Sequence, residues 1–75
     1  MLQLQNAGHT PKATAFDVLT SRGGFAGIIV ENSSTGAARV YFNMSCTKGS
    51  ARAFPSAHAA LTYIHDRRTK KNWTV

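Results

Sequence analysis

Acidic residues are scarce in this chain: three Asp and Glu stand against nine Lys and Arg among 75 residues. So few carboxylates make a catalytic acid/base pair unconvincing, and we do not expect an enzyme. The sequence has one cysteine, which excludes an internal disulfide and agrees with a reducing, cytoplasmic location. No apolar run approaches the ~18 residues of a membrane span, and no signal-peptide pattern opens the chain, so we expect no membrane partner.

The excess of basic residues is the main functional signal. The formal net charge is +6 and the isoelectric point is near 10.3. A small domain of this kind has the electrostatic character of a polyanion binder, so DNA or RNA is the expected partner. Much of the positive charge gathers close to the C-terminal end, in Arg67, Arg68, Lys70 and Lys71.

The length allows one domain, residues 1–75, with a small core. A chain of this size buries only roughly 60% of its unfolded surface, so its stability margin is thin. No disulfide can add to it, and a homodimer is therefore as fair an expectation as a monomer.

Two strands are indicated in the first half of the chain. Residues 1–12 contain Gly8 and Pro11 as breakers and are expected to form a flexible arm with room for one short strand. Residues 14–21 alternate apolar and polar side chains, which is typical of a strand. Residues 25–31 are rich in β-branched side chains and predict a second strand.

The clearest strand pattern covers residues 38–47. One face is apolar and expected to be buried: Val40, Phe42, Met44 and Cys46. The other face is polar and expected to be exposed: Arg39, Tyr41, Asn43, Ser45 and Thr47. Such alternation indicates one buried and one solvated face. A short fourth strand is expected at residues 51–54.

A helix is predicted over residues 56–68, followed by a basic tail at residues 69–75. Ser56 is a good N-cap, and apolar residues recur at helical spacing after it: Ala57, Ala60, Leu61 and Ile64. The predicted fold class is α+β: an antiparallel three- to four-stranded meander sheet over residues 13–54, with the C-terminal helix packed on one face.

Two surfaces are candidates for nucleic-acid contact. The open sheet face would present Arg39 and Tyr41, with Arg22 and Arg52 from neighbouring segments. Arginine donates bidentately to phosphate and guanine edges, and tyrosine can stack on an unpaired base. The second candidate is the basic tail, in which Trp73 would either stack on a base or pack back on the sheet.

Metal and thiol chemistry are not indicated. His58 and His65 lie seven residues apart, about 10 Å along a helix, which is too far for one metal ion. Cys46 shares a face with apolar residues and is expected to be a small buried hydrophobe. We therefore expect no metal site and no cofactor.

Part of the sequence resembles a known family. Residues 24–68 include the strand at 39–42 and the run RAFPSAHAAL at residues 52–61. This pattern resembles the small amino-terminal arm-binding domains of phage-type integrases. The resemblance implies three strands and a helix, with the sheet in the DNA major groove. The chain departs from it by a further strand before Gly23 and by lacking a recombinase domain. It is also similar to small phage- and plasmid-encoded inhibitors such as anti-CRISPR proteins.

The sequence thus favours a small basic DNA-binding protein of a phage or plasmid. The residues expected to contact nucleic acid are Arg22, Arg39, Tyr41, Arg52, Arg67, Arg68, Lys70 and Lys71. The alternative is a protein-interaction module that inhibits a host nucleoprotein complex, with its basic surface against an acidic protein patch.

Overall fold

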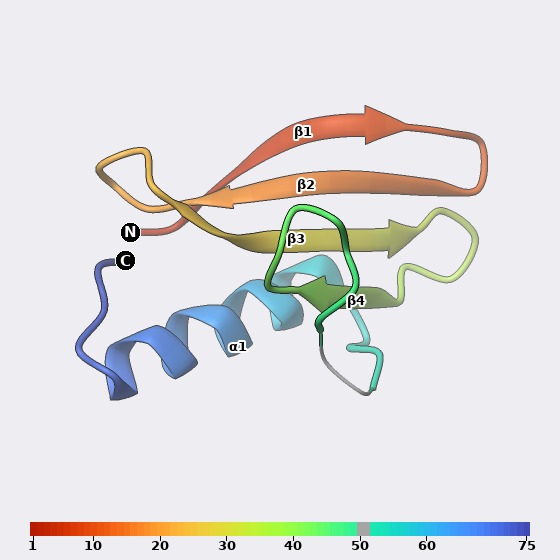
Figure 1. The fold of residues 1–75 in the computed structure, drawn as a ribbon. Helices are drawn as coiled ribbons and strands as arrows, with labels where there is room; N and C mark the ends of the chain where they lie inside the picture. Colours follow the sequence, from red (N-terminus) through yellow and green to blue (C-terminus); the bar gives the residue numbers. More distant parts are fainter. Residues whose placement is uncertain (50–51) are drawn as a thin grey trace.

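The sheet is a meander of four antiparallel strands in the order β1-β2-β3-β4, and one helix lies against it (Figure 1). The computed structural model describes residues 1–49 and 52–75. The elements are β1 (Gln3–His9), β2 (Ala13–Leu19), β3 (Phe25–Asn32), β4 (Ala38–Tyr41) and α1 (Ala57–Lys70). The predicted α+β meander with a C-terminal helix is confirmed.

The helix covers β3 and β4, and the core lies between them. Ile29 and Val40 are cross-strand partners, and both are fully buried together with Ala60 and Ile64 of α1. The matching periods, two in the strands and 3.6 in the helix, place these four side chains on facing surfaces. Ser56 caps the helix, because its hydroxyl accepts the N–H of Ala59 at 3.0 Å.

The N-terminal residues form an edge strand and not the expected flexible arm. β1 pairs with β2 from Gln3, opposite Leu19, to His9, opposite Thr14. A polar turn closes this hairpin, since the Thr10 hydroxyl accepts the N–H groups of the residues two and three positions later, at 3.2 and 3.1 Å. The pairing with β2 therefore orders a segment whose breakers had suggested a loose arm.

β4 ends at Tyr41, well short of the expected end at residue 47. The carboxamide of Asn43 causes this early end. Its oxygen accepts the N–H groups of Thr47 at 3.1 Å and Lys48 at 3.0 Å, and its nitrogen donates to the Ser45 hydroxyl at 2.8 Å. These local bonds compete with the strand ladder and turn the chain into a loop.

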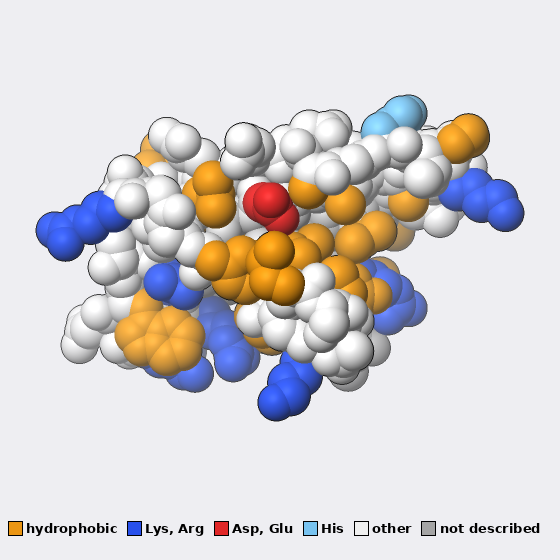
Figure 2. Space-filling model, turned by 45° about the horizontal axis from the view of Figure 1, so that its top comes forward, with side chains coloured by type: hydrophobic (Ala, Val, Ile, Leu, Met, Phe, Trp, Pro, Cys, Tyr) orange, Lys and Arg blue, Asp and Glu red, His pale blue; other side chains and the backbone are white. Residues whose placement is uncertain are grey.

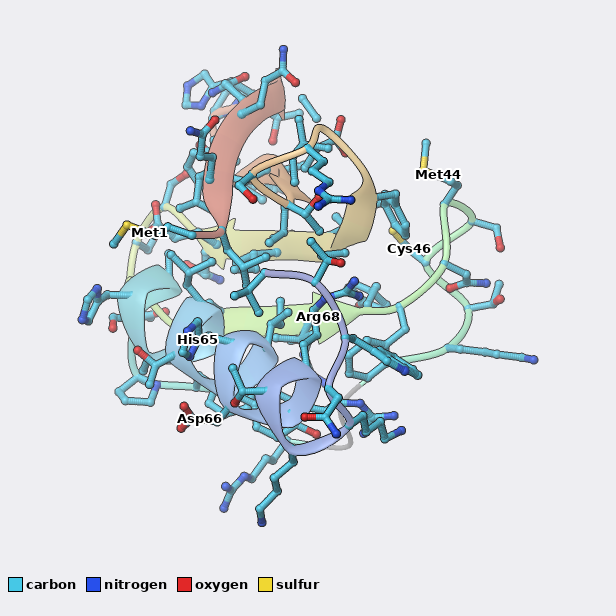
Figure 3. The ribbon with its side chains drawn as sticks, turned by 90° about the vertical axis from the view of Figure 1, so that its left-hand side faces the viewer. Met1, Met44, Cys46, His65, Asp66 and Arg68 are labelled. Atoms are coloured by element: carbon cyan, nitrogen blue, oxygen red, sulfur yellow. The ribbon has the colours of Figure 1, made fainter. Side chains whose placement is uncertain are left out.

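The expected burial of the 38–47 strand is therefore wrong beyond Val40. Phe42 is only partly buried, and Met44 is 71% exposed. Cys46 is exposed in a left-handed conformation, with φ at 56°, and not packed in the core. The loop with Met44 and Cys46 lies on the side of the sheet opposite the helix (Figure 3).

The outer edge of β4 is covered by the chain that returns toward the helix. Ala38 exchanges two backbone hydrogen bonds with Phe54, at 2.9 and 2.7 Å, and Tyr41 bridges Gly49. Phe54 thus pairs through an isolated bridge and not within the expected strand at 51–54, of which residue 51 lies outside the described residues. In the described part of the chain, no helix is long and apolar enough to cross a bilayer.

Candidate nucleic-acid interface

Arg39 and Tyr41 share the open face of the sheet, as the alternation predicts. Their neighbour Val40 points into the core, so these two side chains lie on the opposite face. Arg39 is exposed and Tyr41 is half-buried. The predicted polar row stops there, because Asn43 and Ser45 belong to the loop after β4.

The open sheet face is mainly apolar. The register places Ile28 between Asp17 and Tyr41, and Val30 beside Arg39. Figure 2 shows hydrophobic side chains in a band across the middle of the molecule, with an acidic side chain among them and Lys and Arg nearer the periphery. Arg39 is the only Lys or Arg within the four strands, so the strands present no row of cations to phosphates on this face.

Arg22 and Arg52 do not join Arg39 on the sheet. Arg22 is exposed in the turn between β2 and β3, where its backbone N–H donates to the Thr20 hydroxyl at 3.3 Å. Arg52 lies before the helix, and its guanidinium carbon is 5.7 Å from the centroid of the Phe54 ring. The predicted sheet-face set is thus split among three places.

The C-terminal end of α1 carries four of the nine Lys and Arg side chains of the chain. Arg67, Arg68 and Lys70 are in its last turn, and Lys71 is the C-cap. Cations in these positions are stabilised by the negative end of the helix dipole. The helix runs two residues further than predicted, so Lys70 is held on a helix and not on a mobile tail.

The chain leaves the helix through a defined turn. Asn72 adopts a left-handed conformation with φ at 57° and donates its N–H to the Thr69 carbonyl at 3.1 Å. The next N–H, of Trp73, donates to the Arg68 carbonyl at 2.9 Å. This pair of bonds is a Schellman motif, which fixes where the Trp73 side chain begins.

The last residues are also anchored, so the expected basic tail at 69–75 is not a free arm. The Arg68 side chain donates from Nε to the Thr74 carbonyl at 2.7 Å. An oxygen of Val75 accepts the Ser21 hydroxyl at 3.0 Å and the Met1 amino group at 3.1 Å. The two ends of the chain accordingly lie side by side (Figure 1).

Trp73 is flanked by two cations and is half-exposed. The Arg68 guanidinium carbon lies 5.4 Å and the Lys71 Nζ 4.7 Å from its ring centroid, and 50% of the residue is accessible. Trp73 does not join the core cluster, so it does not pack back on the sheet. A half-exposed indole with cations beside it can accept a base as a stacking partner.

A second contact between a cation and an aromatic ring joins the helix to the end of β4. The Arg67 guanidinium carbon lies 4.5 Å from the Phe42 ring centroid. Beside it is a shallow hollow of about 340 Å³, the same order as a small binding cleft. The hollow is lined by Tyr63, Asp66, Arg67, Lys70 and Lys71.

Ring contacts extend this region to Arg52. The Tyr63 and Phe54 ring centroids are 4.9 Å apart, and Arg52 lies over Phe54. Successive contacts therefore link one set of side chains, which we call the basic–aromatic surface: Phe42, Arg52, Phe54, Tyr63, Arg67, Arg68, Lys70, Lys71 and Trp73. Phe54 is its buried member and connects it to the core. It contains five of the residues predicted to contact nucleic acid and leaves out Arg22, Arg39 and Tyr41.

One carboxylate lies on this surface. Asp66 Oδ1 is 3.4 Å from His65 Nδ1 and does not form an ion pair with Arg67, Lys70 or Lys71. Positive charge is thus concentrated on the surface with little neutralisation by carboxylates. Figure 3 shows Asp66 on the side of α1 that faces away from the sheet.

Sequence reasoning named Trp73 as a possible stacking residue but missed the other aromatic members of the surface. Phe42 had been assigned to the deep core, and Tyr63 had no role. The signal for Tyr63 was its spacing, because it precedes Arg67 by four positions on the same helix face. The signal for Trp73 was Asn72, since asparagine often takes the left-handed position after a helix.

The histidines do not form a metal centre. Within residues 1–49 and 52–75, no group of three or more His, Cys, Asp or Glu side chains could hold a metal ion. His58 and His65 instead border a small hollow near the N-terminus, together with Leu2 and Leu61.

Comparisons with protein-family models, curated proteins and solved structures find no match for this chain.

Proposed function

We propose that this protein binds nucleic acid through the basic–aromatic surface. The observation that carries the proposal is the placement of Trp73, which is half-exposed beside Arg68 and Lys71 and positioned by the turn at Asn72. A fixed, accessible indole among cations combines the two elements that bind a nucleic-acid strand, which are a stacking platform and phosphate ligands.

The chemistry of each side chain on this surface suggests its role in the proposed binding. Lys70 and Lys71 are exposed and would neutralise phosphates, while Arg67 is held over Phe42 and would present a fixed cation beside them. Trp73 would stack on a base, a contact worth about 1–3 kcal/mol. Because a base inside a duplex has no free face, single-stranded DNA is the proposed ligand in preference to duplex.

The sheet residues have a smaller part in this proposal. Arg39 lies alone among apolar neighbours, and Tyr41 is half-buried. Arg22 is near the anchored tail, because the adjacent Ser21 binds Val75. We therefore assign Arg22 and Arg39 at most to long-range attraction of the strand, which acts through charge and needs no fixed geometry.

The test compares two double variants that lose the same charge. Lys70→Gln/Lys71→Gln removes two cations from the basic–aromatic surface, and Lys12→Gln/Arg39→Gln removes two from elsewhere. Fluorescence anisotropy with labelled single-stranded DNA, duplex DNA and RNA would be measured at about 50 and about 200 mM salt. The first variant should weaken binding to single strands more than the second and reduce the salt slope by roughly 0.7 per charge lost.

Equal losses in both variants would show that net charge, and not this surface, drives binding. If wild-type protein binds none of the three nucleic acids at low salt, the proposal fails. The remaining candidate is then an acidic protein partner for the same cations, as in an inhibitor of a nucleoprotein complex. That alternative draws its support from the charge alone, since an acidic protein has no need of the exposed Trp73 ring.

A further inference from the structure

β1 is an open edge of the sheet. All seven of its residues are exposed, and its pairing is with β2 alone. The opposite edge, on β4, is covered by the bridges of Ala38 to Phe54 and of Tyr41 to Gly49. Each chain therefore offers one row of unpaired backbone N–H and C=O groups.

β1 also lacks most features that keep an exposed edge from pairing. Its sequence, QLQNAGH, contains no Lys, Arg, Asp, Glu or Pro, although the chain carries a net charge of +6. Such residues normally protect edge strands. A bulge between Asn6 and Gly8 interrupts the ladder toward the end of the strand, so the regular stretch is residues 3–6.

We propose that two copies of this chain pair through β1, in antiparallel orientation, around a two-fold axis at Leu4. Antiparallel pairing is self-complementary, as a two-fold dimer requires. An axis perpendicular to the sheet keeps residues of one face opposite each other, so Leu4 meets Leu4 of the second copy and Gln3 meets Gln5. The contact covers Leu4, which is a large hydrophobic residue at 39% exposure.

The charge distribution favours a second copy as the occupant. The seam itself is uncharged, so two chains of charge +6 can meet there without like charges in contact. The basic–aromatic surface lies on α1 and near the end of β4. Because α1 packs on β3 and β4, this surface is near the edge of the sheet opposite β1. The two basic surfaces would thus lie at opposite ends of the dimer.

Because each chain has one free edge, the assembly would stop at two copies. A chain with two open edges could add copies at both and form a fibre, whereas pairing at β1 uses the free edge of each copy. The product is an eight-stranded sheet of two chains. A seam of a few strand residues buries less than the ~800 Å² per partner of a standard interface, so the dimer should be weak and dependent on concentration.

The experiment measures mass in solution with matched charge variants. Sedimentation equilibrium of the full chain at about 10 and about 500 µM should show a shift from monomer toward dimer. Leu4→Lys places two cations at the axis and should abolish the shift. Ser34→Lys adds the same charge in the exposed turn between β3 and β4 and should leave it unchanged, with both folds checked by circular dichroism.

If Leu4→Lys fails to fold, a crosslinking variant tests whether two copies pair through β1. Leu4→Cys in a Cys46→Ser background should give a covalent dimer with a short bis-maleimide, far above the yield from the exposed Cys46 of the unmodified chain. Three results would each overturn the proposal. These are a monomer at the highest concentration, a dimer that survives Leu4→Lys, or a Leu4→Cys yield no higher than that from Cys46. None of these results depends on nucleic-acid binding.

Discussion

The guanidinium carbon of Arg67 lies 4.5 Å from the centroid of the Phe42 ring, which joins the last turn of α1 to the residue that follows β4. Phe42 is only partly buried, so this contact takes the place of deeper core packing. The same arginine borders the hollow that Lys70 and Lys71 line. One contact thus connects the stability of the fold to the placement of the basic–aromatic surface.

The energy of this contact can be isolated with a double-mutant cycle. We expect Phe42→Leu and Arg67→Gln to be non-additive, with a coupling of about 0.5–1 kcal/mol, the range for partly exposed pairs of a cation and an aromatic ring. Urea unfolding of the two single variants and the double variant provides the measurement. Fully additive losses would mean that Arg67 and Phe42 lie together without stabilising each other.

Gly49 is a second site at which a substitution should change stability, because an added side chain would have no room there. A Cβ there would lie 2.9 Å from the Tyr41 ring and closer still to the Val40 carbonyl oxygen, so Gly49→Ala should cost about 1–3 kcal/mol. Gly8→Ala is the matched control, because nothing lies within 4 Å of its Cβ position. Thermal unfolding should show a lower midpoint for Gly49→Ala alone. Equal midpoints would refute the close approach of the chain at Gly49 to β4.

The turn at Asn72 should control the position of Trp73. Asn72→Gly should keep or slightly raise stability, since glycine adopts positive φ without cost. Asn72→Val should lose about 1–2 kcal/mol, because a β-branched residue is disfavoured in the left-handed region. Trp73 is the only tryptophan in the chain, so its emission spectrum reports the turn directly. An unchanged spectrum in Asn72→Val would contradict a fixed indole.

Because Cys46 is exposed, we expect its thiol to react readily in the folded protein, which a buried thiol would not do. Cys46 is exposed in the loop after β4, so a thiol reagent should modify it in the folded protein about as fast as in urea. Cys46→Ser should leave the unfolding midpoint unchanged within about 0.5 kcal/mol, as for most surface substitutions. Slow modification of the folded protein would show that the loop covers this side chain.

The sequence predicted regular elements where local and long-range preferences agree. The alternation in residues 14–21, the β-branched run at 25–31 and the capped helix after Ser56 all match elements of the structure. It failed at residues 42–47, where alternation continues but Asn43 bonds to backbone groups within its own loop. Alternation alone does not reveal this competition, because short polar side chains serve an exposed strand face and a turn equally well.

The candidate site was predictable in its charges and in Trp73, and not in its other aromatic residues. Arg67, Arg68, Lys70 and Lys71 stand close together in the sequence, and their helical spacing keeps them close in space. Phe42 is 25 positions from Arg67, and its place depends on where β4 ends and how α1 packs. Neither quantity follows from residue periodicity, so the sheet face was chosen as a surface for nucleic acid although the structure makes it apolar.

The most direct test of nucleic-acid binding at the helix end is a titration of Trp73 fluorescence. Single-stranded DNA should quench the emission to a saturating value, because a base that stacks on the indole changes its surroundings. The midpoint should move to higher DNA concentration as salt rises, and Lys70→Gln/Lys71→Gln should require more DNA than Lys12→Gln/Arg39→Gln. Binding that leaves the Trp73 emission unchanged would contradict the account, because the ligand would then lie elsewhere on the protein.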